Sequence, residues 1–150
     1  MMRSLAGHGQ LLWLGMALAL AACVGPQGAA PGGTAEPLAG TGWRLEELNG
    51  RPPVTSQNVP VPTLMFAADG QRASGNAGCN QFNGAYTQDG ASLRFGPLAS
   101  TRRACADEAG NAQETAYLRA LESTTRFSAT AERLVLYAGD QVVARLVRSE

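Results

Sequence analysis

The sequence contains no lysine, and its single histidine, His8, lies in an N-terminal segment that we expect to be removed. Without histidine, the mature chain cannot form the Ser–His or Cys–His pairs of common hydrolases, and it lacks the commonest zinc ligand. Eleven arginines remain once Arg3 is removed, against twelve acids, so no excess positive charge is available for nucleic acid. We therefore expect no enzymatic activity, no metal or cofactor, and no nucleic-acid partner.

Charged residues are also scarce at the start of the chain, where Arg3 is the only one before Glu36. Residues 11–20 form an apolar run that is too short to span a bilayer comfortably but is typical of a signal-peptide core. The run leads through small residues into Cys23, a pattern that resembles the lipobox of bacterial lipoproteins. We therefore predict a signal peptide over residues 1–22 and acylation of Cys23. The alternative is an ordinary secretory signal with an incidental cysteine.

Val24, rather than Asp, follows Cys23, and the resemblance to lipoproteins then implies sorting to the bacterial outer membrane, with the domain facing the periplasm. Residues 23–37 are rich in glycine, proline and alanine, with almost no large apolar side chain, so we expect a flexible linker behind the lipid anchor. Core-forming sequence begins at Leu38, which predicts one folded domain over residues 38–150.

Alternation of apolar and polar residues recurs along this domain and predicts about eight short strands. In the first strand Trp43 and Leu45 point inward, and later strands are joined by turns at Asp69-Gly70, Asp89-Gly90 and Gly139-Asp140. Short strands at this spacing predict a mainly β domain, a small antiparallel sheet closed or nearly closed into a barrel.

Two places depart from regular strand structure. Asn83-Gly84 interrupts a predicted strand, and we expect a bulge or a close approach of another backbone there. Residues 98–102 are expected as a further short strand.

Residues 111–124 change period, with apolar side chains at three- and four-residue spacing, and predict a single α-helix. Asn111 followed by Glu114 resembles a capping box at its start. The acids Asp107 and Glu108 precede the helix, where negative charge favours the N-terminus. We expect this helix to cover an open end or an edge of the barrel.

Two cysteines, Cys79 and Cys105, remain once Cys23 is acylated, in a compartment that permits disulfides. A disulfide between them is the leading interpretation, and two buried free thiols are the alternative. A nucleophilic cysteine is the least favoured hypothesis, because no histidine or lysine is available to lower its pKa.

Small and polar residues cluster around both cysteines and allow two interpretations. They could line a polar pocket, or they could satisfy the backbone of tight turns through asparagine side chains and glycine dihedrals. For Arg102 the choices are anion binding, or tying loop carbonyls and pairing with Glu114. The structural interpretation is favoured for the whole set: Gly78, Asn80, Asn83, Gly84, Ser100, Thr101 and Arg102.

These same stretches resemble the META domain family, which includes bacterial heat-shock lipoproteins of the HslJ type. The resemblance rests on G-C-N-x-F-x-G-x-Y at residues 78–86 and S-T-x-x-x-C at residues 100–105, and it covers residues 38–147. Arg103 departs from the pattern, since the family usually has methionine there. The resemblance implies a small β-barrel-like domain with one helix, secreted or membrane-anchored and linked to heat or antibiotic stress. It implies no enzymatic activity and no established ligand.

We therefore expect a non-enzymatic, monomeric envelope lipoprotein that supports outer-membrane integrity or stress resistance by binding an envelope component. Its partners would be the membrane, through Cys23, and an envelope protein or a small hydrophobic ligand. The alternative is a small-molecule binding module that uses the barrel mouth as a pocket. Polar groups for that pocket would come from Asn76, Asn80, Asn83 and Arg102.

Overall fold

The computed structural model describes residues 36–103, 105 and 107–150. The predicted signal peptide, Cys23 and all of the linker but residues 36–37 lie outside the described residues. The described chain forms nine strands and one helix: β1 (Gly42–Leu48), β2 (Thr63–Phe66), β3 (Arg72–Asn76), β4 (Gln81–Asp89), β5 (Ser92–Phe95), β6 (Ala99–Ser100), α1 (Glu108–Ser123), β7 (Arg126–Ala129), β8 (Arg133–Ala138) and β9 (Gln141–Arg148).

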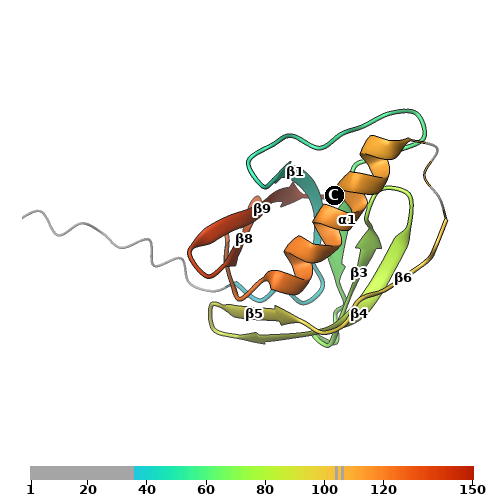
Figure 1. Ribbon diagram of the computed structural model, residues 1–150. Helices are drawn as coiled ribbons and strands as arrows, with labels where there is room; N and C mark the ends of the chain where they lie inside the picture. The colour runs from blue at the N-terminus through green and yellow to red at the C-terminus, as the bar shows by residue number, and fades with distance from the viewer. Residues whose placement is uncertain (1–35, 104, 106) are drawn as a thin grey trace, which may run out of the picture. The chain divides into compact units, whose positions relative to one another are not determined.

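The strands close into an antiparallel barrel, as the sequence predicted. Eight of them follow one another in the order β3-β2-β1-β9-β8-β7-β5-β4, and pairing of β3 with β4 closes the ring. The ninth strand, β6, pairs only with β4. The helix α1 lies across one end of this barrel (Figure 1).

Side chains fill the barrel interior. Alternate residues point inward most regularly in β4 and β5, where buried and exposed positions alternate. The large inward side chains are at most 8% exposed and come from strands all around the ring: Trp43, Phe66, Phe82, Phe95 and Leu136. A ligand therefore has no room among them, which argues against a small-molecule site inside the barrel.

The expected irregularity near Gly84 is present, but on the opposite strand. β4 runs unbroken from Gln81 to Asp89. Tyr86 pairs with Phe95 and Asn83 with Ala99, so the chain between β5 and β6 contains one residue more than the facing stretch of β4. This extra residue bulges over Gly84, and the predicted strand over residues 98–102 shortens to the two residues of β6.

Gly84 permits this bulge because it has no side chain. A Cβ atom there would lie 2.7 Å from Leu98 Cδ2 and 2.9 Å from the carbonyl oxygen of Pro97. The predicted close backbone approach is therefore correct, and the predicted break in β4 is wrong.

The helix begins three residues before the predicted position. Asp107 is its N-cap, with an extended backbone and a carboxylate that accepts a hydrogen bond from Ala109 N–H at 2.9 Å. Asn111 lies in the first turn, and its side chain contacts the backbone of Cys105 at 3.3 Å. The predicted capping box is wrong because Glu114 turns away from Asn111 toward the barrel.

The buried face of α1 joins it to the barrel. Tyr117 is fully buried, packs edge-on against Phe82 and donates to the carbonyl of Thr63 at 3.3 Å. Gln113 exchanges two hydrogen bonds with the backbone of Val54 in the loop before β2. Within the described part of the chain, no helix has both the length and the apolar character needed to cross a membrane.

Candidate functional site

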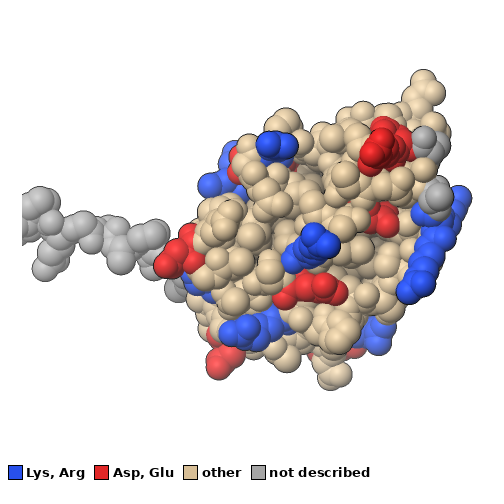
Figure 2. All heavy atoms as spheres, in the orientation of Figure 1, with Lys and Arg blue, Asp and Glu red and all other residues tan. Residues whose placement is uncertain are grey.

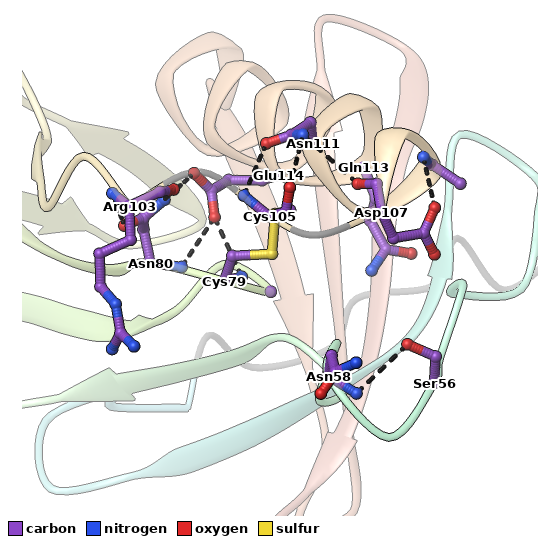
Figure 3. The surroundings of a disulfide bond; sticks show 12 residues. Ser56, Asn58, Cys79, Asn80, Arg103, Cys105, Asp107, Asn111, Gln113 and Glu114 are labelled. Carbon is purple, nitrogen blue, oxygen red and sulfur yellow. Dashed lines mark hydrogen bonds between the residues drawn. A yellow bond between two sulfur atoms is a disulfide. The ribbon is translucent and has the colours of Figure 1, made fainter.

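The two cysteine-containing stretches meet beside α1, where a carboxylate of the helix binds the turn between β3 and β4. Glu114 Oε2 accepts hydrogen bonds from the backbone N–H of Cys79 at 3.1 Å and of Asn80 at 2.8 Å. Its Oε1 accepts from the Asn80 side chain at 2.7 Å. Figure 3 shows Glu114 extending from the helix toward this turn. Glu114 therefore spans 34 positions of sequence to anchor the turn.

Asn80 is the centre of this arrangement and is only 3% exposed. Its amide nitrogen donates to Glu114 and, at 2.8 Å, to the carbonyl of Arg103. Its amide oxygen accepts from Arg103 N–H at 2.7 Å and from the Thr101 hydroxyl at 2.8 Å. We call Asn80, Thr101, Arg103 and Glu114 the Asn80 network. The four bonds use the full hydrogen-bonding capacity of the amide, so Asn80 has none left for a ligand.

The disulfide predicted from the sequence is present between Cys79 and Cys105, with Cα atoms 5.5 Å apart. It joins the β3–β4 turn to the segment that enters α1. A Glu114 oxygen lies within 4.8 Å of both sulfurs, which would place three potential metal ligands together. Sulfur in a disulfide is not a thiolate, however, and the thiolate is the metal-binding form. In this oxidised state the group is structural.

Gly78 shapes the turn that carries Cys79. Its φ of +133° lies in a region that L-residues with side chains rarely adopt. The Asn76 side chain accepts a hydrogen bond from Gly78 N–H at 2.7 Å, which satisfies the turn backbone locally. The structure thus gives Gly78 the conformational role that the structural interpretation expected.

Asn83 and Ser100 take no part in the Asn80 network. Asn83 is exposed on β4 and accepts a hydrogen bond from Arg72 at 2.8 Å. The Ser100 hydroxyl donates to the carbonyl of Thr101 at 3.1 Å.

The role expected of Arg102, tying the loop together, is performed by the Asn80 side chain, which binds the backbone of Arg103. Backbone groups of Arg103 hold the loop to Asn80, whereas the Arg102 guanidinium makes no hydrogen bond or ion pair with any described residue. The sequence marks Arg103 only as a departure from the family pattern, because a backbone contact leaves no signal in the residue type. Arg102 and Arg103 are both exposed.

Two surface grooves flank β6. The first, of about 680 Å³, lies over the outer face of β2, β3, β4 and β6 and includes Asn76 and Asn83. The second, of about 730 Å³, lies between β6 and α1 and includes Asn80 and Arg102. The polar residues expected to converge in one pocket are therefore divided between two open grooves outside the barrel.

Among the residues that the structure describes, the fold clearly shifts the pKa of two groups, the phenols of Tyr117 and Tyr86. Burial raises the pKa of Tyr117 far above its usual value. The pKa of Tyr86 is raised by burial and, to a smaller extent, by the negative charge of Asp69. Both shifts keep the phenol neutral, so Tyr117 serves as a hydrogen-bond donor within the core.

Sequence comparison identifies the family. The META domain model matches residues 36–150, which include the whole barrel, α1 and the Asn80 network. The chain belongs to the META domain family. No curated protein matches it significantly.

Solved structures share the fold of this chain. The META domain is similar to an NMR structure of a protein from Burkholderia xenovorans, with 31% identity, coverage of 75% of this chain and 83% of that one, and a TM-score of 0.61. A second NMR structure is 29% identical over 72% of this chain and 89% of that one, with a TM-score of 0.57.

Proposed function

We propose that this protein is a non-enzymatic envelope lipoprotein that supports outer-membrane integrity under stress by binding an envelope component. The lipobox-like sequence ending in Cys23 supports an acyl anchor, and residues 24–37 suit a tether between lipid and domain. The Cys79–Cys105 disulfide suits an oxidising compartment such as the periplasm.

The observation that carries the binding role is the hydrogen bonding of Asn80, the most buried polar residue of the site. Every hydrogen-bonding position of the Asn80 amide is occupied by the chain itself. Such a network fixes the shape of the surface around β6 and offers no free acid, base or nucleophile. A rigid, polar surface fits recognition better than chemistry.

Deletion and complementation test the proposal. We expect a strain lacking the protein to become more sensitive to heat, detergent and hydrophobic antibiotics, and the wild-type chain to restore resistance. The Cys23→Ala chain should fail to incorporate labelled palmitate and should fail to restore resistance. Unchanged sensitivity on deletion would refute the stress role, and labelling of Cys23→Ala would refute the anchor.

A further inference from the structure

The edge strand β6 carries backbone groups that β4 does not use, at a residue that borders the second groove. Just beyond β6, Thr101 N–H donates to the carbonyl of Gln81 at 3.0 Å, and Gln81 N–H donates to the Thr101 hydroxyl at 3.2 Å, so Thr101 faces Gln81 at a hydrogen-bonded position of the ladder. Because such pairs alternate in antiparallel strands, the neighbouring pair of Ser100 and Phe82 is not hydrogen-bonded. The N–H and C=O of Ser100 therefore point away from β4, and no described residue pairs with them.

The groove beside this edge has the walls that an added strand would need. It is about 730 Å³ in volume and runs between β6 and α1. Leu98 and Leu118 are half-buried and give it an apolar contact surface. Its lining thus suits an extended backbone that places one apolar side chain between strand and helix.

Charge distinguishes the two ends of the groove. Arg102 and Arg103 lie at one end, where Figure 2 shows positive charge along the side of the domain that carries β6. Near the other end, Glu122 approaches the N–H of Leu98 at 3.5 Å. Glu114, on the groove wall, already accepts three hydrogen bonds from the β3–β4 turn. A ligand is therefore favoured if it places a carboxylate beside the arginines.

We propose that an extended peptide segment of a partner protein adds to β6 as a further strand, with an apolar side chain between Leu98 and Leu118 and an acidic group near Arg102 and Arg103. This inference rests on the proposed binding function and specifies the chemistry of its partner. Backbone hydrogen bonds to Ser100 supply affinity, and the apolar and acidic side chains supply specificity.

The test uses the full chain in detergent and a phage-displayed library of random peptides as the probe. Enriched peptides should combine an apolar residue with a nearby acid. Ser100→Pro removes the outward N–H and leaves the β4 ladder intact, because that N–H is not part of it. It should weaken a selected synthetic peptide about tenfold. Ser100→Ala keeps the N–H and should bind normally.

Charge reversal provides a second variant that does not depend on the backbone change. The double variant Arg102→Glu/Arg103→Glu should also weaken the peptide by about tenfold or more. The matched control reverses two exposed arginines outside the groove, Arg44→Glu/Arg94→Glu, and should not change binding. Thermal unfolding of each variant verifies that it is folded.

Three outcomes would overturn the proposal. These are the absence of enriched peptides, enrichment of peptides that bind Ser100→Pro as tightly as wild type, and binding of phosphatidylglycerol vesicles through the two arginines without any peptide selection. None of them depends on the deletion phenotype, so the peptide site can fail while the stress function stands. Conversely, if peptides bind at β6 but deletion has no phenotype, the peptide site stands and the stress function fails.

Discussion

Asn80 is where three separate parts of the chain converge: the β3–β4 turn, the loop after β6 and the helix. Replacing it with alanine would remove four hydrogen bonds at once and leave partners on Thr101, Arg103 and Glu114 unsatisfied. We expect Asn80→Ala to lower the free energy of unfolding by roughly 2–3 kcal/mol, measured by urea denaturation.

Asn83 provides the control, because it lies three positions along, is exposed and makes one side-chain hydrogen bond, to Arg72. Asn83→Ala should change stability by no more than about 0.5 kcal/mol. Equal losses in the two variants would contradict the central role of Asn80.

Because of Tyr117, we expect the free energy of unfolding to fall at alkaline pH. The pKa of Tyr117 in the folded state is raised by burial, so the unfolded chain loses the phenolic proton first as pH rises. The contribution of Tyr117 to the free energy of unfolding is therefore fully present below about pH 10. Above that pH it should fall by about 1.4 kcal/mol per pH unit. Urea denaturation between about pH 9 and 11.5 would measure the slope.

Tyr117→Phe separates the two roles of this hydroxyl. It should lose about 1 kcal/mol at neutral pH, because the carbonyl of Thr63 loses its donor. It should also have a shallower alkaline slope, with a remainder from Tyr86, whose pKa is raised too. An alkaline slope identical to that of wild type would show that Tyr117 does not titrate in this way.

At the scale of elements, the contact between β4 and the bulge after β5 depends on one missing side chain. Gly84→Ala should place its Cβ against Leu98 and Pro97 and cost about 1–3 kcal/mol. Gly96→Ala, in the same bulge, meets nothing closer than 3.6 Å and should be nearly neutral. If Gly84→Ala were also neutral in thermal unfolding, the close packing of this bulge would be wrong.

Local sequence patterns predicted the strands more accurately than the start of the helix. Alternation located the strands well, and Trp43 and Leu45 point inward as expected, because a period of two decides which face is buried. The N-cap was predicted at Asn111, whereas the structure has Asp107 as the N-cap and Glu108 as the first helical residue. Both Asn111 and Asp107 are good N-caps, and only the position of Cys105 at the barrel decides between them.

At the scale of the whole domain, the disulfide ties the turn of one barrel hairpin to the only helix in the described chain. It closes a loop between positions 26 apart and should stabilise the domain by roughly 3–4 kcal/mol. Replacing Cys79 and Cys105 with serine should lower the melting temperature accordingly. Reductant should lower it in wild type and leave the double variant unchanged. A wild-type melting curve that ignores reductant would contradict this contribution.

The amino-acid sequence by itself determined the class of the fold and the approximate number and positions of the strands and the helix, and it favoured a Cys79–Cys105 disulfide over two free thiols. These follow from alternation, turn residues and composition, which act between neighbours or on the chain as a whole. The tertiary structure alone decided that the bulge lies opposite Gly84, that Glu114 anchors a turn 34 positions away, and that the backbone of Arg103 binds Asn80. Closure of the barrel brings these groups together, and the buried Asn80 amide bonds to the donors and acceptors that the fold places beside it. No pattern of adjacent residues encodes that meeting.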